Sequence, residues 1–195
     1  MIQQSVPTGW ERVATAIERV RQRLLKVTRL LNESGIPYAV SGGNAVAEWV
    51  GRVDEAAVRF TKDVDILIRR ADLPALKAVL EPAGFVYHEF HGVSMFLDGP
   101  DSTPKDAVHL LFAGEKVRPE SLVAAPDVFE SEDTRDFSVL QLDALIRMKL
   151  TAFRDKDRTH VRDMLDVGLL DASWRNRLPP ELASRFQTLL DTPDG

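Results

Sequence analysis

Two aspartates inside an apolar strand place the strongest constraint on how this chain folds. Asp63 and Asp65 flank Val64 and lead into the apolar run Ile66–Ile68. Because strand side chains alternate between faces, both carboxylates are expected on one face, roughly 6–7 Å apart along the strand. Two like charges on a buried strand are costly unless a cation lies between them. The pattern therefore predicts a divalent metal site, and Mg²⁺ is usually held by one or two carboxylates plus substrate phosphates.

A glycine pair precedes the aspartates by about twenty residues. Gly42 and Gly43 follow Ser41 at the end of a short strand expected over residues 37–41. Backbone N–H groups of such a turn, with those of the next helix, can face a phosphate. The segment lacks the Gly-Lys-Ser/Thr of a P-loop and the third glycine of a dinucleotide fingerprint. Taken alone, the pair indicates only a tight turn.

The composition is that of a globular protein and excludes several classes. The chain has 195 residues, of which 44% are hydrophobic, and no apolar run is long enough to span a membrane. The absence of cysteine rules out a disulfide scaffold and a thiolate metal site. Met1–Ser5 does not resemble a signal peptide, so a cytoplasmic location is expected. The net charge of −5 argues against a general nucleic-acid coat protein but leaves room for a local basic pocket.

A regular apolar stripe predicts a long first helix. Thr8 is its expected N-cap, with Glu11 as capping-box partner, and the helix is expected to reach about Asn32. The stripe has alternating steps of three and four and consists of Trp10, Val13, Ile17, Val20, Leu24, Val27 and Leu31. Packing across a sheet is the favoured role. So regular a seam can also pair with its own copy, which makes a homodimer the alternative prediction.

The rest of the chain predicts an α+β fold. Further strands are expected at 63–68, 85–89, 93–97 and 107–112, and helices at 44–50, 72–80, 141–153, 157–169 and 180–190, with a surface connection at 118–132. This order indicates a mixed β-sheet flanked by helices, with a helical C-terminal lobe. We divide it into an N-terminal amphipathic helix (1–35), an α/β core (36–135) and the helical lobe (136–195), which form one compact unit.

Four motifs, in this order, resemble the nucleotidyltransferase superfamily of the polymerase-beta type. Two are the glycine pair after Ser41 and the segment Arg59–Asp65, which has the pattern Arg-x-Thr-x-Asp-x-Asp. Lys149–Ala152 resembles the lysine helix of the AbiEii-type branch, and Arg162–Asp166 resembles its Arg-Asp-x-x-Asp segment. The resemblance covers about residues 36–170. It implies a nucleotidyltransferase-like sheet and a cleft closed by the C-terminal helices.

The resemblance also implies a reaction and roles for particular residues. Such enzymes transfer a nucleoside monophosphate from a nucleoside triphosphate to an acceptor. For this chain the acceptor is expected to be a protein, an RNA or a small molecule. The AbiEii likeness also implies a link to toxin–antitoxin systems. Asp63 and Asp65 would hold Mg²⁺ (or Mn²⁺) against the triphosphate. Asp163 would position Lys149 or meet the acceptor. The expected nucleotide contacts are Ser41, Gly42, Gly43, Arg59, Thr61, Lys149 and Arg162.

One position departs from the family pattern. Active members usually have a third carboxylate on a later strand, which binds metal and helps to activate the acceptor hydroxyl. The aligned residue is His109, because Asp106, three residues earlier, faces away by strand alternation. Two interpretations stay open. The imidazole accepts a proton or binds a softer metal, or the chain is a catalytically degenerate nucleotide-binding or partner protein of the same fold.

Charged residues also gather between residues 154 and 163. The basic residues among them would suit an acceptor such as tRNA, but the interleaved Asp155, Asp157 and Asp163 favour a self-paired helix junction. His160 is expected to be a polar residue on a helix face rather than a catalyst.

Overall fold

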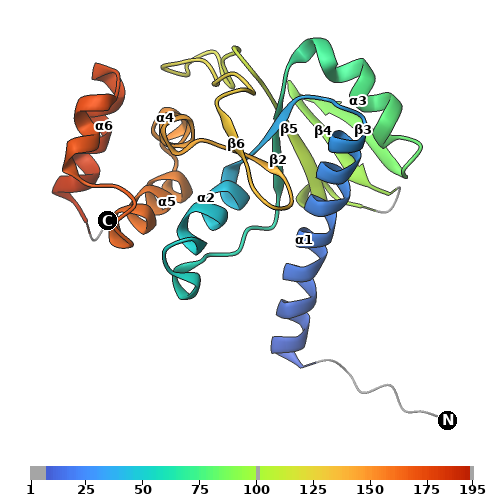
Figure 1. The fold of residues 1–195 in the computed structure, drawn as a ribbon, viewed down its shortest axis with the longest axis horizontal. Helices are drawn as coiled ribbons and strands as arrows, with labels where there is room; N and C mark the ends of the chain where they lie inside the picture. The colour runs from blue at the N-terminus through green and yellow to red at the C-terminus, as the bar shows by residue number, and fades with distance from the viewer. Residues whose placement is uncertain (1–7, 100–101, 194–195) are drawn as a thin grey trace.

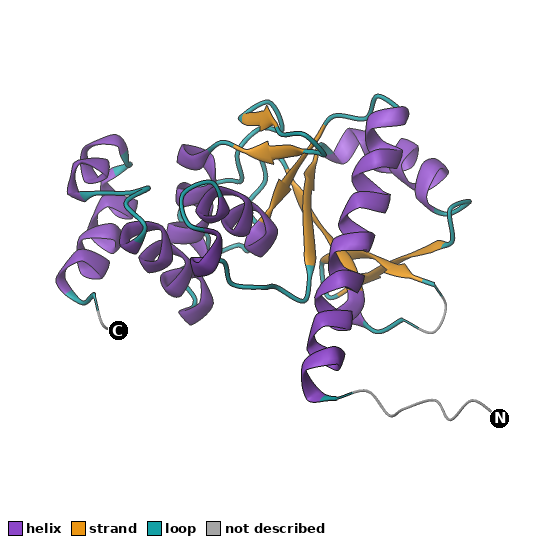
Figure 2. Ribbon diagram, turned by 60° about the horizontal axis from the view of Figure 1, so that its bottom comes forward, coloured by secondary structure: helices purple, strands orange, loops and turns teal. Residues whose placement is uncertain are grey.

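The computed structural model describes residues 8–99 and 102–193 and contains one mixed sheet with helices on both faces (Figure 1, Figure 2). The strands are β1 Tyr38–Ser41, β2 Val64–Ile68, β3 Phe85–Phe90, β4 Val93–Asp98, β5 Ala107–Phe112, β6 Ser131–Asp133 and β7 Ser138–Leu140. The helices are α1 Gly9–Glu33, α2 Gly42–Gly51, α3 Leu73–Leu80, α4 Leu142–Ala152, α5 Asp155–Asp166 and α6 Pro180–Asp191. The seven strands lie in the order β3-β4-β5-β2-β1-β7-β6. The predicted fold class is therefore confirmed.

Strand β2 divides the hydrophobic core into two layers. Val64, Ile66 and Ile68 pack with α1 and α3 on one face of the sheet. Leu67 belongs to the other layer, where α2, α4, α5 and α6 pack. Asp65 alternates with Ile66 and therefore faces the second layer. The C-terminal helices form a lobe on that side of the sheet, away from α1 and α3 (Figure 1).

Helix α1 begins as the sequence predicted but packs over only part of its length. The reciprocal capping box between Thr8 and Glu11 is present. All of its buried residues lie between Arg23 and Leu31, and its N-terminal half extends past the sheet (Figure 1). There Trp10 is 84% exposed and Val13 is 50% exposed. The predicted packing against the sheet is thus confirmed for the second half of the helix, and pairing with a second copy stays a prediction.

Other boundaries differ locally from the predictions. Helix α2 starts at Gly42 rather than Asn44, because Gly42 has a φ of +64° and turns the chain directly from β1. Helix α5 covers 155–166 rather than 157–169. Within the expected surface connection, β6 pairs antiparallel with β7. The segment Met1–Ser5 lies outside the described residues. Within the described part of the chain, no helix is long and apolar enough to cross a membrane.

Candidate active site

One end of the sheet brings three predicted site residues into a row. Asp65 pairs with Ser41 on the antiparallel β1 and with His109 on the parallel β5. Residues that pair directly across strands project to the same face of the sheet. The Asp65 carboxylate therefore lies between the side chains of Ser41 and His109. Asp63 immediately precedes β2 and follows the same alternation.

The glycine pair packs directly onto the segment that carries the carboxylates. A Cβ on Gly42 would lie 1.8 Å from Oδ2 of Asp65, and a Cβ on Gly43 would lie 2.7 Å from the Cβ of Thr61. One residue further on, Asn44 Nδ2 donates a hydrogen bond of 2.8 Å to the carbonyl of Asp63. Gly42 and Gly43 are thus required by the close approach of the α2 N-terminus to the Asp-x-Asp segment, as well as by the turn.

Lys149 reaches the site from α4 through a buried ion pair. Its side chain is 6% exposed, and its Nζ lies 3.3 Å from Oδ1 of Asp157 on α5. Arg154 Nε donates to the other oxygen of Asp157 at 2.7 Å. Burial lowers the pKa of Lys149, while the charges of Asp157 and Asp65 oppose that change. Although burial acts against it, hydrogen bonding to Arg154 and the Lys149 charge hold the pKa of Asp157 below its usual range.

Asp65 has the electrostatic environment of a cation ligand. Burial raises the pKa of Asp65, the charges of Lys149 and His109 act in the opposite direction, and Asp63 adds to the rise. A desolvated carboxylate beside a second carboxylate is stabilised in its charged form by a bound cation. Among the described residues, no three carboxylate or histidine side chains converge into a metal cage of their own. The two carboxylates thus fit Mg²⁺ of the kind that shares its coordination with substrate phosphates and water.

The two α5 motif residues that were predicted for the site have different partners. Asp163 accepts hydrogen bonds of 2.9 and 2.8 Å from Nε of Arg59, in the loop before β2. Arg162 donates to the carbonyl of Thr192, just beyond α6, at 3.1 and 2.8 Å. The structure thus joins Asp163 to Arg59, whereas the carboxylate next to Lys149 belongs to Asp157. The predicted self-pairing of this helix junction is confirmed for Asp157, which pairs with Arg154, and for Asp155, which pairs with Arg158.

Two further α5 residues belong to this surface. Lys156 Nζ lies 3.8 Å from Oδ2 of Asp63. His160, one turn later, has a buried Nδ1 with no hydrogen-bond partner among the described residues. Burial, reinforced by the charge of Lys149, lowers the pKa of His160 to about 4, so its imidazole is neutral at physiological pH. The predicted helix-face position is thus partly buried, because His160 follows Lys156 by four residues and precedes Asp163 by three, on the side of α5 that faces the site.

Lys149→Met is expected to lower the free energy of unfolding by about 3 kcal/mol, because it leaves the buried Asp157 carboxylate with Arg154 alone. Urea denaturation measures the change. The double variant Lys149→Met/Asp157→Leu should regain most of the loss, since an apolar pair has no charge to desolvate. Lys156→Met is the matched control, because Lys156 is 54% exposed and its loss should change stability by less than about 0.5 kcal/mol. Equal effects of the two lysine substitutions would contradict the structural role of the Lys149–Asp157 pair.

Comparison with known proteins identifies the family. A family described as uncharacterised nucleotidyltransferase matches residues 8–119, which is more than half of the chain and includes both carboxylates and the glycine pair. The chain belongs to this nucleotidyltransferase family. No curated protein matches the sequence. The family match does not assign this nucleotidyltransferase to the AbiEii-type branch, and it ends before Lys149.

Solved structures extend the likeness of this nucleotidyltransferase to the C-terminal lobe. The antibiotic-resistance factor ANT(2'')-Ia in solution has a TM-score of 0.54 at 13% identity, over 91% of this chain and 92% of that one. ANT(2'')-Ia in complex with adenylyl-2''-tobramycin has a TM-score of 0.53 at 14% identity, over 88% and 98%. An antigenic nucleotidyltransferase-like protein from Paracoccidioides brasiliensis has a TM-score of 0.53 at 16% identity, over 91% and 90%. At these identities the likeness establishes the fold.

Proposed function

We propose that this nucleotidyltransferase transfers a nucleoside monophosphate from a nucleoside triphosphate to an acceptor hydroxyl, with Mg²⁺ (or Mn²⁺) held by Asp63 and Asp65. The observation that carries the proposal is the desolvated Asp65 carboxylate, which lies against the α2 N-terminus and is influenced by the charge of Lys149. The metal would neutralise triphosphate charge and orient the pyrophosphate leaving group. In the reaction the acceptor oxygen bonds to the α-phosphorus as the bond to pyrophosphate breaks.

The side chains around the carboxylates supply the remaining contacts. The backbone N–H groups of Gly42 and Gly43 begin α2 and are suited to phosphate oxygens, because a helix N-terminus favours anions. Lys156 is 54% exposed beside Asp63, so its ammonium group can turn to the triphosphate. Lys149 is buried and held by Asp157, so we assign it to balancing the charge of Asp65. The acceptor proton would leave to His109, which is adjacent to Asp65.

The acceptor class remains part of the proposal. ANT(2'')-Ia has been solved with an adenylylated antibiotic, tobramycin, which makes a small-molecule hydroxyl one option for this chain. A protein or an RNA is the other, and either would suit a component of an AbiEii-like toxin–antitoxin system. A cytoplasmic location and a homodimer stay predictions. Light scattering over a range of protein concentrations tests the homodimer, and a monomer throughout would contradict it.

A catalytically degenerate nucleotide-binding protein is the second candidate. It is favoured by the presence of an imidazole, rather than a third carboxylate, beside Asp65 on β5. The test is incubation of the protein with each labelled triphosphate, Mg²⁺ or Mn²⁺, and cell extract. We expect a labelled product with the wild type and none with Asp63→Ala/Asp65→Ala. Triphosphate binding by calorimetry without product, combined with a gain of activity in His109→Asp, would establish the degenerate alternative instead.

A further inference from the structure

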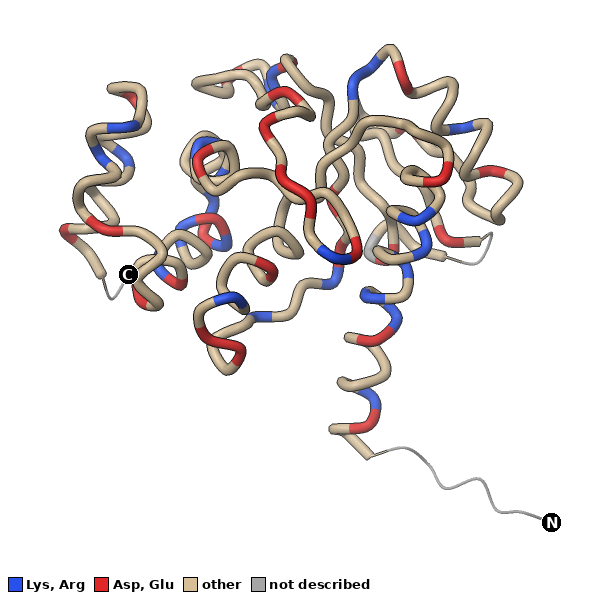
Figure 3. Tube along the Cα trace, in the orientation of Figure 1, with Lys and Arg blue, Asp and Glu red and all other residues tan. Residues whose placement is uncertain are grey.

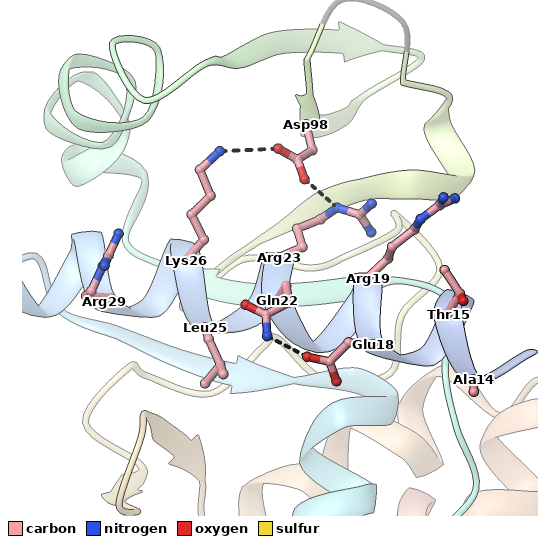
Figure 4. Close-up of a pocket in the computed structure, with 10 residues that line it drawn as sticks. All are labelled: Ala14, Thr15, Glu18, Arg19, Gln22, Arg23, Leu25, Lys26, Arg29 and Asp98. Carbon is pink, nitrogen blue, oxygen red and sulfur yellow. Dashed lines mark hydrogen bonds and ion pairs between the residues drawn. The ribbon is translucent and has the colours of Figure 1, made fainter. Parts of the chain in front are cut away.

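A groove lies on the opposite face of the sheet from the carboxylates, along the outward side of α1. It has a volume of about 880 Å³ and is bounded by α1 and by Asp98 at the end of β4 (Figure 4). Its charged lining consists of Glu18, Arg19, Arg23, Lys26, Arg29 and Asp98. Helix α1 as a whole has six basic and three acidic residues, although the chain has a net charge of −5. Positive charge is therefore concentrated on this helix (Figure 3).

Arg23 is the least exposed cation of the groove, and its donors are incompletely used. Its side chain is 6% exposed, with Nε 3.4 Å from Oδ2 of Asp98. Lys26 Nζ also lies 3.4 Å from Asp98, so two cations share one carboxylate (Figure 4). Within the described part of the chain, Nε and Nη1 of Arg23 have no hydrogen-bond partner. A buried donor without a partner costs about 1–3 kcal/mol. These two atoms are enclosed by the protein, so Arg23 contributes positive charge to the groove rather than a direct contact.

The four cations of the groove form a row rather than a single pocket. Arg19 and Arg29 are ten residues apart, so the row extends about 15 Å along the helix axis. Three of the four are arginines, whose guanidinium groups match phosphate oxygens in a bidentate geometry. A row of this length suits several phosphates in succession better than one small anion.

One lining residue of the groove, Asp98, lies at the end of the sheet that carries the carboxylates. Leu97 pairs with Ala107 at the start of β5, and Val108 pairs with Val64 at the start of β2. Asp98 and Asp63 therefore lie at the same sheet end and are separated by one intervening strand, a spacing of about 10 Å across the sheet. The N-terminal half of α1 projects beyond this end (Figure 1). A flexible chain that lies in the groove can pass round the sheet end to the candidate active site.

We propose that this groove binds the sugar–phosphate backbone of a single-stranded RNA, which is the acceptor of the transfer reaction. The proposal rests on the proposed function and narrows its acceptor to one class. Arg19, Lys26 and Arg29 hold successive phosphates, and the buried Arg23 adds positive charge beside them. A single strand fits because it can bend round the end of the sheet, whereas a duplex is too stiff to do so over about 10 Å.

Fluorescence anisotropy with a short, fluorescein-labelled, single-stranded RNA of mixed sequence, without triphosphate or metal, tests the proposal. Each phosphate contact on a single strand contributes about 0.7 to the slope of log affinity against log salt concentration. Each contact therefore changes the affinity about fivefold for a tenfold change in salt concentration. Arg19→Ala/Arg29→Ala removes two exposed cations, so affinity near 0.1 M salt should fall about 25-fold and the slope by about 1.4. Asp98→Asn should instead strengthen binding about fivefold, because it removes one negative charge from the groove lining and releases Lys26, while Arg23 keeps Asp106 at 3.9 Å.

Arg12→Ala is the matched control, because Arg12 is an exposed residue of the same helix outside the groove lining. It should retain wild-type affinity. Unchanged binding in Arg19→Ala/Arg29→Ala would overturn the proposal. So would a polyglutamate peptide that competes as well as RNA, since the groove would then suit an acidic protein partner.

Failure of the RNA-binding proposal can be distinguished from failure of the proposed transfer function. RNA binding that survives in Asp63→Ala/Asp65→Ala, together with a wild type that transfers no nucleotide to any acceptor, would retain the groove and reject the proposed function. Transfer to a protein or small molecule by a wild type that binds no RNA would reject the groove alone.

Discussion

Asp65→Asn is expected to abolish nucleotide transfer while leaving the folded protein at least as stable as the wild type. The amide has the shape of the carboxylate but lacks the charge that a metal–triphosphate complex requires. Stabilisation of transition-state charge by a bound metal is worth several kcal/mol, which corresponds to a loss of at least about 10³-fold in kcat. Because burial raises the pKa of Asp65, the charged carboxylate is itself disfavoured in the metal-free protein, and a neutral side chain relieves that cost.

Two measurements test this expectation together. Labelled-triphosphate assays give the loss of transfer, and thermal unfolding with and without Mg²⁺ and triphosphate gives the binding. The melting temperature of the wild type should rise with both ligands, because they bind only the folded state, and that of Asp65→Asn should not. Asp155→Asn is the control, since Asp155 is 92% exposed on α5. Asp65→Asn protein that keeps more than about a tenth of the transfer activity would contradict a metal role for Asp65.

The carboxylate strand was predictable because its signal is local. Alternation from Asp63 to Ile68 fixes which side chains face which layer, and the structure places Val64, Ile66 and Ile68 in the α1 layer accordingly. The Lys149–Asp157 pair was not predictable in this way. It depends on the reversal between α4 and α5, where Phe153 has a φ of +50°. A bulky residue is rare in that region of backbone space, so no sequence pattern indicates where the two helices meet.

The length of α1 explains why its predicted packing across the sheet is confirmed for only part of the helix. The apolar stripe is uniform along the sequence, which indicates one role for the whole helix. Its 25 residues extend about 37 Å, whereas strands of four to six residues give a sheet only about 13–20 Å wide along the strands. Part of the helix must therefore project beyond the sheet, and periodicity alone does not say which part.

Gly42→Ala is expected to lower the free energy of unfolding by about 2–5 kcal/mol. A left-handed φ costs a non-glycine residue about 1–2 kcal/mol, and Gly42 has a φ of +64°. Overpacking adds about 1–3 kcal/mol, because the new Cβ would lie 1.8 Å from Oδ2 of Asp65. The displaced carboxylate should also weaken Mg²⁺–triphosphate binding. Chemical denaturation and calorimetry measure the two effects.

Gly35→Ala separates the two causes of the loss. Gly35 has a φ of +63° and no atom within 4 Å of its added Cβ, so it should lose only about 1–2 kcal/mol. In an Asp65→Gly background the clashing Oδ2, Cγ and Cβ are all absent, and Gly42→Ala should then cost about as much as Gly35→Ala. A coupling energy of about 1–3 kcal/mol in this double-mutant cycle would assign Gly42 to the close approach of α2 to the carboxylate. If the cycle shows no coupling, Gly42 serves the turn alone, and the glycine pair no longer supports a phosphate site beside Asp65.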